Sequence, residues 1–268
     1  MSGMVTQIWW TTTLFFAAAF VVTLLAQQVD SRQINAENVW AKPAKFALSL
    51  ALHFLTLALV ADRLGSAWQG SGVLIAVALA ATICGVLELA YIAFQASRQL
   101  PSHFYVGTPL YAGLYAAMGI GAVIIVLAAG FVGGIAWMDS SLPLAAPLRS
   151  AIGIGLVGGT ILTLLTALRL GANMSHAIGT EAPGAARMPL TGWSITVGDL
   201  RPSHFLATHM MQAVPVVGLV AAWLLPEQAA TLLVWLFASG WTWLTLATFR
   251  LALAGRPLRL ALRERQTV

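Results

Sequence analysis

The stretch from Asp199 to Gln212, Asp-Leu-Arg-Pro-Ser-His-Phe-Leu-Ala-Thr-His-Met-Met-Gln, begins as a polar loop and continues into a hydrophobic segment. It places His204 at this boundary and His209 inside the segment. A helix needs about 20 apolar residues to cross a bilayer core of about 30 Å, and residues 203–225 reach that length. A polar side chain at membrane depth is costly, and it is kept where it is satisfied or used. The stretch therefore predicts a membrane-spanning helix that carries an imidazole below the membrane surface.

The composition extends this prediction to the whole chain. Of 268 residues, 59% are hydrophobic and 9% are charged, whereas soluble domains carry about a quarter of charged residues. A single cysteine, Cys84, excludes a disulfide framework and a multi-cysteine metal site. Lysine and arginine gather in short connecting segments rather than in one patch, which argues against nucleic acid as a partner.

Hydrophobic segments recur along the sequence and define the expected architecture. We predict an all-α polytopic membrane protein, a single domain over residues 1–268, with seven transmembrane helices and a short basic tail at 252–268. The expected spans are about 8–26, 46–61, 73–95, 109–137, 150–173, 203–225 and 229–251. The connection from 174 to 202 is too polar to span the membrane.

The distribution of basic residues predicts the orientation. Two basic residues, Arg63 and Arg149, fall on one side of the predicted topology. The other side holds Arg32, Lys42, Lys45, Arg98, Arg169, Arg187, Arg201, Arg250, Arg256, Arg259, Arg263 and Arg265. Because cytoplasmic loops carry the excess of lysine and arginine, the N-terminus should face outward and the C-terminus the cytoplasm.

Three strongly polar residues fall inside the predicted spans. Counted along the helices, His53, Glu88 and His209 lie at a similar depth, on the order of 10 Å below the cytoplasmic interface. Helical spacing places Tyr91 and Gln95 on the same face as Glu88. We expect these polar faces to point into the bundle, where the three residues would form one site.

A tetrapeptide occurs twice, as Pro101-Ser-His-Phe104 and Pro202-Ser-His-Phe205. Each copy precedes an outward-going helix, where serine is a good N-cap and the helix N-terminus favours anions. The repeat therefore suggests either a capping device or a cytoplasmic anion or lipid-headgroup site. In the second case, the site would be formed by His103 and His204 with the nearby Arg98 and Arg201.

The first functional hypothesis is a cofactor protein. His53 and His209 on different helices are suited to be axial ligands of haem b for redox chemistry, with a redox partner. Lys42, Lys45, Arg98 or Arg201 would then pair with the propionates. In a variant, a transition metal is bound by His53, His209 and Glu88.

Two other classes of function remain open. A proton-coupled transporter or channel for a small polar solute would use Glu88 and the histidines as a proton relay, because imidazole titrates near neutral pH. A membrane sensor or accessory subunit would use the basic tail to bind membrane lipids. The absence of a lysine for a Schiff base in the last span argues against standard retinal chemistry.

Small residues indicate how the helices pack. Gly130 with Gly134, and Gly155 with Gly159, have the four-residue spacing that permits close helix approach, within the chain or in an oligomer. With these features we expect a multi-pass protein of the cell membrane, the bacterial inner membrane.

Overall fold

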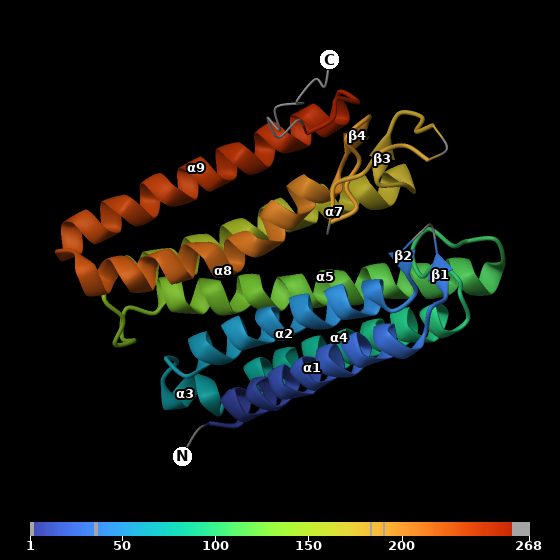
Figure 1. Cartoon of the computed structure of the whole chain (residues 1–268). Helices are drawn as coiled ribbons and strands as arrows, with labels where there is room; N and C mark the ends of the chain where they lie inside the picture. The colour runs from blue at the N-terminus through green and yellow to red at the C-terminus, as the bar shows by residue number, and fades with distance from the viewer. Residues whose placement is uncertain (1–2, 35–36, 183, 190, 259–268) are drawn as a thin grey trace.

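The computed structural model describes residues 3–34, 37–182, 184–189 and 191–258, which form a bundle of long helices (Figure 1). Seven helical segments are long and apolar enough to cross a membrane. In chain order they are α1 Met4–Val29, α2 Ala41–Ala61, α4 Gly72–Ser97, α5 Pro109–Met138, the continuous run of α6 Ala146–Gly153, η1 Ile154–Gly158 and α7 Gly159–Asn173, then α8 Arg201–Leu224 and α9 Glu227–Leu253. The predicted all-α polytopic bundle is confirmed.

Short elements lie at the two ends of the bundle. The helix α3, Ser66–Gln69, lies at the same end as the N-terminus (Figure 1). At the opposite end, β1 Gln33–Ile34 pairs antiparallel with β2 Glu37–Asn38, and β3 Ala177–Ile178 pairs antiparallel with β4 Gly198–Asp199. An odd number of crossings thus separates the two termini of the described chain.

The helix boundaries follow the predicted spans to within a few residues, with the largest difference at the start of α2. This helix begins at Ala41 rather than near residue 46, so that Lys42 and Lys45 lie on the helix and not in the loop. Pro43 is tolerated there because the N–H groups of a first helical turn have no helical partner. The prediction from hydrophobicity placed the start of this span after Lys45, and it therefore missed the polar first turn of α2.

Most basic side chains of the described residues lie at the end that holds the two β-ribbons. At the opposite end, Arg149 donates hydrogen bonds to the backbone carbonyls of Ala136 and Leu142, and so fastens the start of α6 to the end of α5. The tail residues Arg259, Arg263 and Arg265 lie outside the described residues. By the positive-inside rule, the ribbon end is the expected cytoplasmic end.

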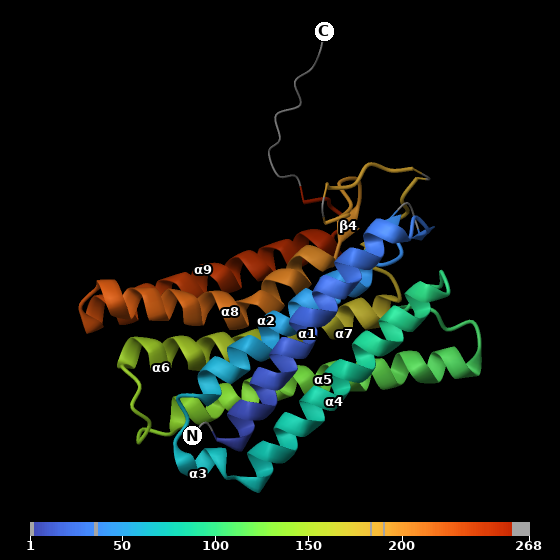
Figure 2. The same ribbon diagram turned by 60° about the horizontal axis from the view of Figure 1, so that its bottom comes forward.

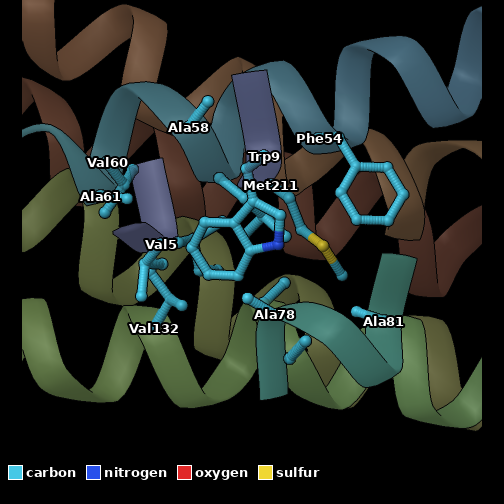
Figure 3. Packing of buried hydrophobic residues seen from close by; sticks show 14 of the residues in the cluster. Val5, Trp9, Phe54, Ala58, Val60, Ala61, Ala78, Ala81, Val132 and Met211 are labelled. Carbon is cyan, nitrogen blue, oxygen red and sulfur yellow. The ribbon is translucent and has the colours of Figure 1, made fainter. Parts of the chain in front are cut away.

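Two large hydrophobic clusters form the core. The first lies mainly between α1, α2, α4 and α5, and it contains Phe16. Figure 3 shows Trp9 and Phe54 of this cluster. The rings of Phe16 and Phe54 stack with centroids 5.4 Å apart, above Gly85, whose Cβ position would be 3.1 Å from both rings. The second cluster joins α6, α7, α8 and α9 through residues such as Met210.

The two clusters correspond to two groups of helices. The helices α8 and α9 run side by side in both views (Figures 1 and 2), and Figure 1 shows them away from α1 and α4. Met211 of α8 belongs to the first cluster and fastens the two groups together (Figure 3). The boundary between the groups therefore lies where α2 meets α8 and where α5 meets α6, η1 and α7.

The fifth span is irregular where it packs against α8. Its middle section, η1, is a π-helix, and Pro215 interrupts the hydrogen-bond ladder of α8 at the same level. A Cβ on Gly155 would lie 2.6 Å from Pro215 Cδ, and a Cβ on Gly159 would lie 2.6 Å from Met211 Cγ. This pair of glycines therefore serves close packing inside the chain. Of the other pair, the Cβ position of Gly134 has no neighbouring atom within 4 Å.

Candidate functional site

His53 and His209 lie on α2 and α8, the two helices that meet at the boundary between the two helix groups. His53 of α2 is 6% exposed, and its Nε2 atom is buried without a hydrogen-bond partner among the described residues. His209 of α8 has Nδ1 at 3.2 Å from Gln212 Oε1, and its ring centroid lies 4.3 Å from that of Phe205. The two imidazoles are close enough to interact electrostatically. Two of the three predicted site residues are thus electrostatic neighbours.

Glu88 lies apart from this pair. Its side chain on α4 is 8% exposed, and it interacts electrostatically with Lys42 of α2. No hydrogen bond to its carboxyl group is found within the described chain. Among the described residues, no group of three or more histidine, cysteine, aspartate or glutamate side chains could hold a metal ion. The set of His53, His209 and Glu88 is therefore not assembled as metal ligands.

The earlier start of α2 also changes the depth of His53. His53 lies twelve residues after Ala41, which is about 18 Å along the helix axis. His209 lies eight residues after the start of α8, or about 12 Å. The two imidazoles consequently differ in distance from the starts of their helices.

His103 lies in the connection between α4 and α5 and contacts Lys42. Lys42 Nζ is 3.0 Å from His103 Nδ1, and Ser102 Oγ is 3.2 Å from the same nitrogen. Burial lowers the pKa of the His103 imidazole to about 3, and the Lys42 ammonium acts in the same direction. The imidazole of His103 is therefore neutral at pH 7 in this arrangement.

His204, the second histidine of the repeated tetrapeptide, lies in the first turns of α8. Its Nδ1 atom is 3.0 Å from Thr166 Oγ1 of α7. Its imidazole interacts electrostatically with both His209 and His103. It thus connects the buried histidine pair with the loop histidine.

Sequence reasoning missed His176, which completes the group. This residue follows α7, and its ring centroid lies 5.7 Å from that of Phe104. Its backbone carbonyl accepts a hydrogen bond of 2.9 Å from the Leu200 N–H group. Burial lowers its pKa to about 4, and Arg201 acts in the same direction. The small number of histidines could have pointed to His176, because the chain has five of them and all five lie in this region.

The two predicted anion-binding arginines have other partners. Arg98 donates a 3.0 Å hydrogen bond to Tyr111 Oη and lies over the Phe94 ring. Arg201 forms an ion pair of 2.6 Å with Asp199. Burial alone would raise the pKa of Asp199, but the hydrogen bonds and the charge of Arg201, together with the Ser194 N–H group, lower it. Arg201 therefore fastens the 174–200 connection to the start of α8.

The serines of the repeated tetrapeptide do not cap helices, in contrast to the first interpretation of the repeat. The N-cap of α5 is Thr108, whose Oγ1 atom accepts a 3.3 Å hydrogen bond from the Tyr111 N–H group. Ser203 lies inside α8 and donates to the Leu200 carbonyl. The capping interpretation fails because α8 begins before the second serine and α5 begins several residues after the first.

The titratable side chains form a connected series from the ribbon end toward the middle of the bundle. Electrostatic neighbours follow one another along it in the order His53, His209, His204, His103, Lys42 and Glu88. The buried Tyr91 Oη and Gln95 Oε1 atoms on the same helix as Glu88 have no hydrogen-bond partner within the described chain. Buried polar atoms of this kind are commonly satisfied by internal water.

No family model, curated protein or solved structure matches the chain.

Proposed function

We propose that the protein is a proton-coupled transporter or channel for a small polar solute, in which the histidine series carries the proton. The series of electrostatically neighbouring imidazoles between His103 at the expected cytoplasmic end and the buried His53 is the observation that supports this proposal. Histidine titrates near neutral pH, and intramembrane acids and histidines are the usual groups of proton relays. We further propose the bacterial inner membrane as its location.

The chemistry of the series suits proton transfer. Each neutral imidazole has one donor and one acceptor nitrogen and can pass a proton by taking it at one nitrogen and releasing it at the other. In His103, Nδ1 is the acceptor for Lys42, so Nε2 carries the proton. At the far end, His53 Nε2 is buried without a partner and is available to a proton, a water molecule or a solute.

The outer part of the bundle differs from the inner part. Among the described residues, the charged groups of the outer end are in the connecting segments or the first turns of helices: Asp62, Arg63, Asp139, Arg149 and Glu227. Threonines on the outer half of α1, such as Thr12 and Thr13, donate to the carbonyls of their own helix. The passage beyond His53 would therefore require a change in helix packing, as in alternating access.

Charge movement in proteoliposomes tests this function. A rapid pH jump on a solid-supported membrane should give a transient current with the wild-type chain, and a panel of amino acids, sugars and carboxylates then screens for the solute. His53→Ala and Glu88→Gln should abolish most of the current, whereas Cys84→Ala, one turn from Glu88 on α4, should retain it. A wild-type current equal to that of protein-free vesicles, or full currents in both variants, would refute the proposal.

Haem binding is the second candidate, and one observation favours it. His53 Nε2 has no partner, and Gln212 holds His209 at Nδ1, which leaves Nε2 of His209 free to bind iron. His53 and His209 would hold the haem, which would supply one-electron transfer to a redox partner. The purified protein should then show a Soret absorption band that is lost in His53→Ala and in His209→Ala. A wild-type spectrum without this band removes the candidate.

A further inference from the structure

We infer that Lys42 is shared between His103 and Glu88, and that its movement from one to the other couples protonation of His103 to ionisation of Glu88. The inference deepens the proposed function and rests on it, because it assigns the entry step of the proton series. Lys42 would be a positioning residue, since it would control the two titrating groups without itself gaining or losing a proton.

The structure shows the first of the two positions. Lys42 Nζ lies 3.0 Å from His103 Nδ1 and 5.9 Å from the centroid of the Phe46 ring. Because an ammonium group only donates, His103 Nδ1 must be the unprotonated acceptor. The ring of His103 is fixed further by Phe46 and Tyr115, with centroid distances of 5.5 and 6.4 Å. In this position the hydrogen bond from Lys42 blocks His103 Nδ1, the nitrogen that would accept an incoming proton.

Glu88 offers the second position. Lys42 of α2 and Glu88 of α4 already interact electrostatically, and the carboxyl group has no hydrogen bond within the described chain. The lysine side chain is a flexible four-carbon stem with a compact charge, so the ammonium group can turn from one partner to the other. A buried carboxylate without a partner is strongly unfavourable, so the Lys42 ammonium group would stabilise the ionised form of Glu88.

The other charged and titratable groups around these three residues are few. Glu37 acts on Lys42, but it is exposed and already forms an ion pair with Lys45. His176 and His204 face His103 from the 174–200 connection and from α8. Cys84 is the titratable neighbour of Glu88 on its own helix. Lys42 is thus the cation that both His103 and Glu88 share.

The coupled step conserves protons and charge. A proton from the cytoplasmic side binds His103 Nδ1, and the hydrogen bond from Lys42 breaks because two cations cannot share it. The Lys42 ammonium turns to Glu88, whose protonated carboxyl group releases its proton as the ion pair forms. One proton is bound and one is released, and the net charge of the three residues stays +1. Burial lowers the His103 pKa to about 3 and Lys42 acts in the same direction, so the departure of Lys42 favours protonation of His103.

Histidine titration by nitrogen NMR in nanodiscs tests the first half of this step. With five histidines, the His103 signal is identified by its loss in His103→Gln. Lys42→Met should raise the pKa of His103 by about one pH unit or more, since a neighbouring cation is removed. Lys45→Met is the matched control, three residues along the same helix, and should leave this pKa unchanged. Equal His103 pKa values in wild type and Lys42→Met would overturn the inference.

Infrared spectroscopy tests the second half. The infrared band of the Glu88 carboxylic acid is identified by its loss in Glu88→Gln. In the wild type this band should weaken as the pH is lowered through the range in which His103 is protonated. The band of an ordinary carboxyl group grows on acidification. In Lys42→Met the band should grow on acidification, and Lys42→Arg, which keeps the charge, should behave like wild type. If the wild-type band instead grows on acidification, the proposed movement of Lys42 from His103 to Glu88 is refuted.

The spectra separate this inference from the proposed function. Inverse titration without any proton current would keep the exchange and reject transport. A proton current together with ordinary titration of Glu88 would keep transport and reject the exchange.

Discussion

Replacement of Asp199 by asparagine should open the 174–200 connection. The side chain of Asp199 is 2% exposed and pairs with Arg201 at 2.6 Å, and its carboxylate also accepts the Ser194 N–H group at 2.8 Å. Asn preserves the shape but removes the charge. Breaking a buried ion pair costs about 3–5 kcal/mol, but the Arg201 side chain is 27% exposed and water replaces part of the lost interaction. We expect a loss of about 2 kcal/mol in local stability.

This loss is measurable as amide hydrogen exchange. Each 1.4 kcal/mol changes an opening equilibrium about tenfold, so exchange in residues 191–200 should accelerate about 30-fold in Asp199→Asn. Glu181→Gln removes the other ion pair of the same connection, where the Arg187 side chain is 44% exposed. That exposed pair is worth about 0–1 kcal/mol, and the control should accelerate exchange by less than about fivefold. Equal exchange in the two variants would show that Asp199 does not fasten the connection.

The same carboxylate predicts a pH dependence. The pKa of Asp199 is lowered in the folded chain from its ordinary value of 3.8. A lowered pKa stabilises the folded state above the ordinary value, and this contribution is lost as the pH falls through the folded value. Exchange in residues 191–200 should therefore accelerate below about pH 4 in the wild type and show no such acid step in Asp199→Asn.

Two further predictions concern helix packing. Gly159→Val should destabilise the bundle by more than about 2 kcal/mol, because its Cβ would lie 2.6 Å from Met211 Cγ. Gly134→Ala is the control and should be neutral or slightly stabilising, because its Cβ has no neighbouring atom within 4 Å. Unfolding in sodium dodecyl sulfate compares the stability of the two variants. Trp241→Phe removes the 2.7 Å hydrogen bond from Nε1 to the Leu206 carbonyl and should cost about 1 kcal/mol in the same assay, and an unchanged midpoint would contradict this.

The spans could be predicted from the sequence because bilayer thickness sets their length. Every expected span coincides with a helix. The electrostatic proximity of His53 and His209 agrees with the expectation that polar residues avoid lipid. The separation of Glu88 from this pair could not be predicted, since it depends on which helices are neighbours and how each is rotated.

The role of the connecting segments was harder to predict. Lys42 was assigned to a loop because its charge masked the first turn of α2. His176 received no role, because its place beside Phe104 depends on how the 174–200 connection folds back on the bundle. Such contacts arise from tertiary structure and leave no periodic pattern in the sequence.

The π-helix η1 and Pro215 weaken two neighbouring helices at one level. A proline removes one hydrogen bond and a π-turn widens its helix, so bending stiffness is lowest there. This level divides α8 into an inner arm with His204 and His209 and an outer arm that leads into α9, and α9 packs beside both arms. A tilt of the inner arm alone would change the distance from His204 and His209 to His53. Such a tilt would therefore control whether a proton can pass between these imidazoles.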